Sequence, residues 1–152
     1  MKKNIELLHG DCLELMKDIA DKSIDMIVCD LPYGVTQNKG DVCLPFDKLW
    51  EQYERIIKDN GAIALFAQGL FYVDLVNSNR KLFKYDLIWN KVLTTGFLNA
   101  KRMPLRCHEQ IAIFYKKQPT YNPQFTEGKP LHGRGNSYKS KEAKNQNYGK
   151  FE

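Results

Sequence analysis

An acid, a proline, an aromatic ring and a glycine stand together in the stretch Asp30-Leu31-Pro32-Tyr33-Gly34. Proline fixes its own φ and restricts the residue before it, and glycine lets the chain leave sharply, so we expect the acid and the ring to be held in place. A carboxylate, a peptide oxygen and an aromatic face suit a flat heterocycle with an amino group, because the ring stacks while the oxygens accept its N–H protons. An extruded nucleobase is one such ligand.

The position of this turn also suits ligand binding. It follows Ile24 to Cys29, an apolar run of strand length that is typical of a strand covered on both faces. Ligands of open α/β sheets collect outside the carboxyl ends of the strands, where Asp30 stands. Gly10-Asp11-Cys12 likewise follows a short strand predicted over Asn4 to His9. Asp11 is equally suited to cap the next helix, and the two roles are compatible.

The remaining pattern alternates helix and strand, which predicts a layered α/β fold. The predicted helices are Cys12 to Ala20, Pro45 to Lys58 and Leu70 to Leu82, and the further strands are Ala62 to Ala67, Tyr85 to Asn90 and Gln110 to Tyr115. A polar loop is predicted from Lys91 to Glu109. We expect Trp89 to lie in the core, and His108 with Glu109 to form a structural pair that holds the loop.

Asp30-Leu31-Pro32-Tyr33 resembles the Asp-Pro-Pro-Tyr motif of the DNA amino-methyltransferases, in the branch where this motif comes near the amino terminus. Further segments resemble family positions in order and approximate spacing across residues 4–117: Gly10-Asp11-Cys12, Asn60-Gly61-Ala62, Trp89-Asn90-Lys91 and His108-Glu109. Leu31 replaces the usual second proline. The change is expected to be tolerated, because the role at that position belongs to the backbone carbonyl.

The resemblance implies an enzyme that methylates an exocyclic amine of DNA with S-adenosylmethionine. Asp30, Leu31, Pro32 and Tyr33 would form the catalytic motif, and Asp11, Cys12 and Asp30 would contact the cofactor. Aspartate at the head of the motif goes mostly with adenine in this family, so we expect adenine rather than cytosine. No metal is needed. RNA is a less favoured substrate.

Charge is distributed unevenly along the chain. Residues 1–60 carry 8 Lys/Arg against 12 Asp/Glu, whereas residues 61–152 carry 15 against 6. A basic half is typical both of a surface that binds a polyanion and of a solvated basic surface. Within the predicted loop the candidates for DNA contact are Lys91, Asn99, Lys101, Arg102 and Arg106. Double-stranded DNA is the expected partner, and solvent contact is the alternative role of these side chains.

The family's Gly-rich Phe-x-Gly-x-Gly loop, its later ribose-binding acid and its His-Pro-Thr-Gln-Lys-Pro-like segment have no counterpart in these 152 residues. In this branch they lie towards the carboxyl end, together with two strands that separate the first strand from the Ile24 strand. We therefore expect an incomplete Rossmann-like α/β sheet with helices on both faces and an antiparallel last strand. Such a sheet would be completed by more of the same chain, by a second chain, or by dimerisation or rearrangement.

The expected organisation is a partial catalytic domain over residues 1–117 and a polar, basic tail over residues 118–152, in loop or partly disordered conformation. The His132-Gly133-Arg134-Gly135 stretch of the tail follows no predicted strand and opens no helix, so it is not a Gly-rich nucleotide loop. No apolar run is long enough to span a membrane, and the four cysteines lack metal or disulfide spacing. We expect a cytoplasmic protein with buried free thiols.

Two classes of function follow from these observations. The first is a DNA methyltransferase of a restriction-modification type that is active only when its carboxyl-terminal part is supplied. The second is a non-catalytic remnant that binds DNA or a partner chain through its basic loop and tail.

Overall fold

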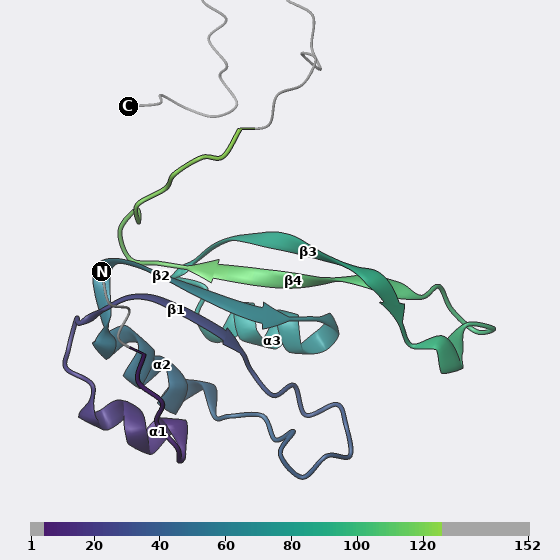
Figure 1. Cartoon of the computed structure of the whole chain (residues 1–152), viewed down its shortest axis with the longest axis horizontal. Helices are drawn as coiled ribbons and strands as arrows, with labels where there is room; N and C mark the ends of the chain where they lie inside the picture. Colours follow the sequence, from purple (N-terminus) through teal and green to yellow (C-terminus); the bar gives the residue numbers. More distant parts are fainter. Residues whose placement is uncertain (1–4, 126–152) are drawn as a thin grey trace, which may run out of the picture. The chain divides into compact units, whose positions relative to one another are not determined.

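A computed structural model describes residues 5–125 of the chain. The chain divides into one unit up to Tyr121 and a second from Asn122. All helices and strands described belong to the first unit (Figure 1). The predictions for residues 126–152, which include most of the polar tail and its glycines, lie outside the described residues.

The first unit is built on a mixed four-stranded sheet. Its strands are β1 Ile24–Asp30, β2 Ile57–Ala67, β3 Phe83–Thr95 and β4 Arg106–Phe114, in the order β1-β2-β4-β3. β1 and β2 are parallel, whereas β4 runs antiparallel to both of its neighbours. The expected α/β fold with an antiparallel last strand is therefore confirmed.

The predicted strand over Asn4 to His9 is wrong within the described part, because residues 5–9 form no strand. A strand needs a partner for its backbone groups, and the described residues offer this segment none. β1 lies at an edge of the sheet with β2 as its one neighbour there. Its outer N–H and C=O groups are thus left without a strand partner in the described residues.

The helices are shorter than their patterns predict. Asp11 caps α1 Cys12–Leu15 by accepting from the Leu13 N–H at 2.8 Å, and the 3₁₀ helix η1 Met16–Asp18 follows. The predicted extension to Ala20 is wrong because the chain is already extended at Ile19. α2 Phe46–Ile56 begins after Pro45 and passes directly into β2, so Lys58 is in a strand.

α3 Gly69–Ser78 ends four residues before the predicted Leu82. Asn79 explains the early end, because its side chain is engaged outside the helix. Its amide donates to Glu54 Oε1 at 2.9 Å, and its Oδ1 accepts from the Leu82 N–H at 3.3 Å.

One face of the sheet carries the core. Helices α1, α2 and α3 lie on the same side of the sheet (Figure 1), and their buried side chains join those of β2 and β4 in one apolar cluster. The Trp50 and Phe114 rings pack with centroids 4.8 Å apart, and Trp50 Nε1 donates to Ser78 Oγ at 2.7 Å. This bond ties α2 to α3.

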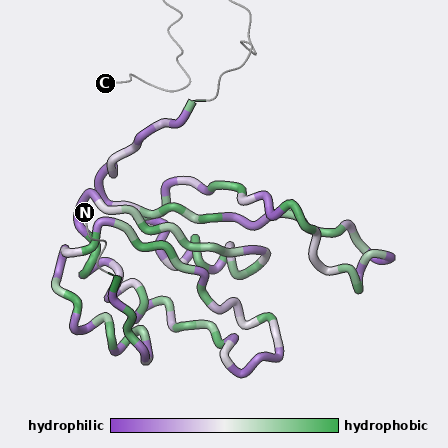
Figure 2. The backbone as a smooth tube through the Cα atoms, in the orientation of Figure 1, coloured by the Kyte–Doolittle hydropathy of each residue, from purple (hydrophilic) through white to green (hydrophobic). Residues whose placement is uncertain are grey.

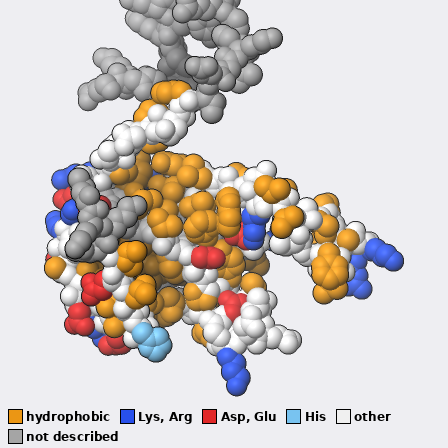
Figure 3. Space-filling model, viewed as in Figure 1, with side chains coloured by type: hydrophobic (Ala, Val, Ile, Leu, Met, Phe, Trp, Pro, Cys, Tyr) orange, Lys and Arg blue, Asp and Glu red, His pale blue; other side chains and the backbone are white. Residues whose placement is uncertain are grey.

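The other face of the sheet is open in the described part of the chain. The register brings Val28, Ala64, Ile113 and Tyr85 to the same side of their four strands, across the whole width of the sheet. Large exposed apolar side chains on this side are Met26, Val28, Tyr85, Leu87 and Trp89. Figure 2 shows hydrophobic residues along these strands, and Figure 3 shows apolar side chains gathered over the sheet.

This open face corrects three expectations. β1 is not covered on both faces, because Val28 is 58% exposed. Trp89 lies on the open side rather than in the core. Within residues 5–125 the helices cover one face instead of both, since no described element packs on the other.

The predicted loop from Lys91 to Glu109 is strand at both of its ends. β3 continues to Thr95 and β4 begins at Arg106, so the loop proper is short and contains the 3₁₀ helix η2 Phe97–Asn99. The strands extend into this polar sequence because β3 and β4 pair with each other. The apolar pattern of the sequence predicts only shorter strands.

The thiols are free but not buried as expected: Cys12, Cys43 and Cys107 are exposed, and Cys29 is half-buried. In residues 5–125 no helix has both the length and the apolar character that a bilayer crossing requires.

Candidate active site

Asp30 and Tyr33 face each other at the end of β1. The Tyr33 hydroxyl donates to Asp30 Oδ1 at 3.0 Å, and the Asp30 side chain is exposed. Asp30 is also the last β1 residue paired with β2, opposite Phe66. The carboxylate is therefore presented to solvent beyond the carboxyl end of a parallel strand, as the sequence predicts.

The Tyr33 ring is held by α3. It stacks on Phe71 with ring centroids 4.8 Å apart and an interplanar angle of 26°. Partial burial raises the pKa of the Tyr33 phenol above its ordinary value, and the Asp30 hydrogen bond and the charge of Glu109 raise it further. The phenol is thus a neutral hydrogen-bond donor at physiological pH.

The buried side chain of Leu31 anchors the turn to the core. Its side chain is 5% exposed and belongs to the core cluster, while the exposed acid before it points outward. A leucine at this position therefore fixes the turn by burial. Its carbonyl lies in the backbone between the two predicted functional side chains, where the resemblance assigns it a role.

Gly34 ends the turn in a conformation that favours glycine. Its φ is +68°, and a Cβ there would meet Cys43 Sγ at 2.8 Å. Both the left-handed backbone and the close sulfur exclude most side chains at this position. The sharp exit from the turn is as the sequence predicts.

Asp41 closes the loop that follows the turn. Its carboxylate accepts from the backbone N–H groups of Gly34 at 2.8 Å, Val35 at 3.0 Å and Thr36 at 2.7 Å. Hydrogen bonding from the Thr36 side chain, followed by the Gly34 and Thr36 amides, lowers the pKa of Asp41 to about 2. The segment after Tyr33 is therefore fixed by a charged residue.

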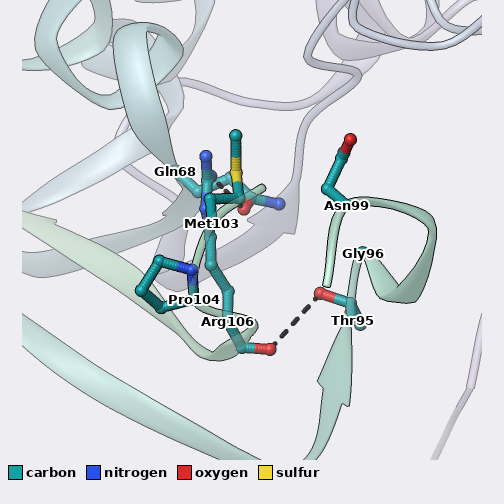
Figure 4. A pocket seen from close by; sticks show the side chains of 7 residues that line it. All are labelled: Gln68, Thr95, Gly96, Asn99, Met103, Pro104 and Arg106. Atoms are coloured by element: carbon teal, nitrogen blue, oxygen red, sulfur yellow. Dashed lines mark hydrogen bonds between the residues drawn. The ribbon is translucent and has the colours of Figure 1, made fainter. Parts of the chain in front are cut away.

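A second strand end lies beside the first. Gln68 directly follows β2, and its Oε1 accepts from Arg106 NH1 at 3.2 Å. These two residues border a hollow of about 200 Å³, which we call the arm hollow (Figure 4). Its lining residues are Gln68, Thr95, Gly96, Asn99, Met103, Pro104 and Arg106.

A neighbouring hollow of about 300 Å³ shares Gln68 and Arg106 and is also lined by His108 and Glu109. Asp30 and Tyr33 line neither hollow. The Asp30–Tyr33 turn is therefore next to these concavities in the fold, through the pairing of β1 with β2, but it is not inside them.

Glu109 is the buried acid of the described residues. It is 7% exposed, and its Oε1 lies 2.5 Å from Lys91 Nζ. The predicted pair of His108 with Glu109 is thus replaced by an ion pair with Lys91, because neighbouring strand residues point to opposite faces. This pair holds the base of the β3–β4 hairpin, where the same ammonium also lies 5.6 Å from the Trp89 ring centroid.

The predicted cofactor contacts are only partly brought together. Asp11 borders a hollow of about 350 Å³ between α1 and α2, which neither Cys12 nor Asp30 lines. Cys12 and Asp30 both lie near the Cys29 thiol, whose pKa is raised mainly by burial and further by these two groups. Asp11 Oδ1 is engaged as a helix cap.

The five predicted DNA contacts all lie on the β3–β4 hairpin, but their side chains differ in availability. Lys91 is paired with Glu109, and Arg106 is bonded to Gln68. Asn99 borders the arm hollow. Lys101 and Arg102 are exposed near the tip.

Gln68, Phe71 and Asp41 were not predicted from the sequence. Gln68 stands immediately after a predicted strand, so the same strand-end position that marks Asp30 also marks it. The Phe71 and Asp41 contacts span long or irregular segments and have no comparable sequence signal.

Comparison with known proteins places this geometry in context. No protein-family model matches the chain. Type II methyltransferase M.HinfI of Haemophilus influenzae is 29% identical, in a match that covers 70% of this chain and 40% of that protein. The chain thus spans less than half of this relative's length.

Solved structures show the same fold. The crystal structure of the M1.HpyAVI–SAM complex superposes with a TM-score of 0.60 at 19% identity and covers 80% of this chain and 60% of that one. PvuII DNA methyltransferase, described as cytosine-N4-specific, gives a TM-score of 0.54 at 16% identity and covers 72% of this chain and 49% of that one. These similarities confirm the partial Rossmann-like fold, and together with the M.HinfI match they confirm the resemblance to DNA methyltransferases.

Proposed function

We propose that this chain carries the base-binding part of a DNA methyltransferase that uses S-adenosylmethionine to methylate the exocyclic amine of adenine. The observation that carries the proposal is the 3.0 Å hydrogen bond from Tyr33 to Asp30 on a turn anchored by buried Leu31. It holds an acceptor and an aromatic ring together beyond a strand end. The similarity to M.HinfI supports the reaction class.

The proposed chemistry follows from the electronic structure of the amine. Its lone pair is delocalised into the heterocycle, so it is a weak nucleophile while the amine stays planar. Asp30 and the Leu31 carbonyl accept hydrogen bonds from its two N–H groups, which favours a tetrahedral nitrogen and stabilises the positive charge that would develop on it as the C–S bond to the methyl group breaks. The methylated nitrogen would then release one proton towards Asp30 and solvent. Tyr33 uses Oδ1 of Asp30, and we assign Oδ2 to the amine. The Tyr33 ring stacks on the extruded base.

The cofactor fits the described residues in part. Asp11 and Asp30 provide acceptors for amino and hydroxyl groups, but they do not line a common hollow. When bound, S-adenosylmethionine supplies an electrophilic methyl group. We assign Asp11, Cys12 and Asp30 to its contact surface, and assign the rest of its binding site to a completing segment, meaning further protein that pairs with β1.

The open sheet supports such a completing segment. The β1 edge and the apolar face that contains Val28 and Leu87 lack cover in residues 5–125. More of the same chain, a second chain and a second copy are the three candidates. Residues 1–117 are the proposed catalytic part, with the cytoplasm as its location and a restriction-modification system as its context.

Transfer of labelled methyl groups from S-adenosylmethionine to duplexes tests the proposal. With the completing segment present, we expect incorporation into adenine-containing duplexes, a loss of at least roughly 100-fold with Asp30→Ala, and unchanged incorporation with Asp74→Ala, an exposed aspartate of α3. Duplexes in which only cytosine is available, and matching RNA, separate the substrates. Incorporation that is equal in wild type and Asp30→Ala would refute the assigned role.

The open β1 edge favours one other function, a non-catalytic remnant that binds DNA or a partner chain. In that case the same protein binds duplex DNA with a marked salt dependence and incorporates no methyl groups in any of these substrates.

A further inference from the structure

The end of the β3–β4 hairpin projects from the sheet (Figure 1) and exposes apolar side chains. We call residues 91–105 the arm. Phe97 is 75% exposed and Leu98 is 84% exposed, and Val92 and Leu93 are exposed beside them on the incoming strand. Apolar and basic side chains are both visible at the tip in Figure 3. Such side chains are normally withdrawn from water, so their presentation here needs an explanation.

The tip is an ordered turn that holds these side chains outward. Gly96, with φ +84°, precedes η2. The Asn99 N–H donates to the Gly96 carbonyl at 2.9 Å, and the Asn99 carbonyl accepts from the N–H groups of Arg102 at 2.8 Å and Met103 at 3.0 Å. Two successive turns therefore fix the positions of Phe97 and Leu98 relative to the strands.

The arm also contains a strained residue. Val92 has φ +66°, which is costly for a β-branched side chain, and its N–H donates to Asn90 Oδ1 at 3.0 Å. The β3–β4 pairing is irregular between Asn90 and Thr95. Backbone strain of this kind clusters at functional segments. Here it lies at the base of the arm, where the β3–β4 pairing is interrupted.

The charges around the tip identify the occupant. Lys101 and Arg102 are exposed within a few residues of Phe97, and among residues 5–125 no carboxylate forms a salt bridge with either. An apolar pair flanked by unpaired cations matches duplex DNA, in which apolar side chains enter between bases while cations contact the phosphates.

The arm is connected to the end of the sheet that carries Asp30. Arg106, at the base of the arm, is bonded to Gln68, which directly follows β2, and β2 pairs with β1 as far as Asp30. The arm hollow lies at this junction and is lined from both sides (Figure 4). A duplex that contacts the arm is thereby brought to the same end of the sheet as the Asp30 turn.

We propose that Phe97 and Leu98 form a wedge that enters the base stack of duplex DNA, next to the nucleotide presented to Asp30, while Lys101 and Arg102 contact the flanking phosphates. This inference rests on the proposed function for the choice of DNA. It adds a device for opening the stack, which the catalytic motif itself does not contain.

Fluorescence anisotropy with two labelled duplexes tests the wedge, because one duplex is intact and the other has a single abasic site where the stack is already open. We expect the full chain to bind the abasic duplex roughly tenfold more tightly. Phe97→Ala and Leu98→Ala should bring this ratio close to one. Leu7→Ala, which removes a 91% exposed leucine outside the arm, should leave it unchanged.

Lys101→Ala separates phosphate contact from insertion. It should weaken binding to both duplexes equally and reduce the slope of affinity against salt by about one, while the abasic preference persists. Equal affinity of wild type for the two duplexes, or an unchanged ratio in both wedge variants, would overturn the proposal. Binding to anionic vesicles that depends on Phe97, without discrimination between duplexes, would overturn it in favour of a membrane surface.

The test is independent of methyl transfer. A preference for the abasic duplex that is lost in Phe97→Ala supports the wedge even when no methyl group is incorporated, whereas incorporation without that preference supports the enzyme and refutes the wedge. Circular dichroism of each variant checks that the fold is retained, as expected for exposed side chains.

Discussion

The Tyr33 side chain contacts Asp30 through its hydroxyl and Phe71 through its ring, and these two contacts have separable effects. The hydrogen bond orients a carboxylate that is otherwise exposed. The stack determines where the ring lies, because Phe71 belongs to the buried side of α3. We therefore expect function at this site to depend on the ring position as well as on the hydroxyl.

Comparison of Tyr33→Phe with Tyr33→Ala tests this separation. The phenylalanine keeps the stack and loses only the hydrogen bond, so we expect methyl transfer to fall by less than about tenfold, whereas the alanine should lower it by roughly 100-fold or more. Steady-state incorporation kinetics measure both. Equal losses in the two variants would show that the ring position is not important.

Asp41 gives a pH-dependent prediction. Its folded pKa of about 2 is below the ordinary 3.8, so its contribution to loop stability is complete at pH values well above 3.8 and is lost as pH falls towards 2. Hydrogen-exchange protection of the Gly34 and Thr36 amides should fall over this range. Asp41→Asn should lower their protection already at neutral pH, and Asp74→Asn should not. Full protection in Asp41→Asn would contradict the role of the charge.

At the scale of elements, the long apolar patterns predict the core elements α2 and β2, and they also predict the edge strand β1. The extension of β3 to Thr95 and of β4 back to Arg106 is not predictable from the sequence alone, because it depends on pairing between two polar segments. The strand expected over residues 4–9 is wrong within the described residues because its sequence pattern is apolar enough but no described segment pairs with it.

The residues of the candidate site also divide into those that local sequence predicts and those whose contacts depend on the fold. Asp30, Tyr33 and Gly34 were predictable because a strand end, a proline and a glycine mark them locally. Phe71 and the Lys91–Glu109 pair required the fold, since each contact joins segments far apart in the chain. Whether the predicted residues bind a base or cofactor stays a prediction.

Gly61 tests the packing of β1 on β2. The pairing shifts between Ile24 opposite Ile57 and Met26 opposite Ala62, and a Cβ on Gly61 would lie 2.8 Å from the Asp25 carbonyl oxygen. Gly61→Ala should therefore lower the free energy of unfolding by about 1–3 kcal/mol, because backbone has to move. Urea unfolding measures the change. Gly40→Ala, where a Cβ meets nothing within 4 Å, should change it by less than about 0.5 kcal/mol.

At the scale of the whole molecule, the first unit has one filled face and one open face. The filled face contains the helices and the core, whereas the open face presents apolar side chains beside an unpaired β1 edge within the described residues. Exposed apolar sheet with a free edge is prone to association. The purified chain is therefore expected to associate with itself unless a completing segment is bound.

Charge on the open face should suppress this association. We expect Leu87→Lys to shift the chain towards monomer in sedimentation velocity experiments, because burying an unpaired ammonium in an apolar contact is unfavourable. Leu70→Lys introduces the same charge at an exposed leucine of α3, on the side of the helices, and should leave the distribution unchanged. A monomeric wild-type chain would show that the open face is not a contact surface by itself.

The burial of Leu31 has a consequence for how this protein tolerates mutation. The peptide oxygen assigned to the amine belongs to a residue whose side chain is packed among core residues such as Leu49 and Leu65. Substitutions deep in the interior, far from any ligand, therefore displace that oxygen. Selection for methyl transfer would then also act on the volumes of the core side chains. We expect inactive variants that remain folded and keep every polar residue of the site.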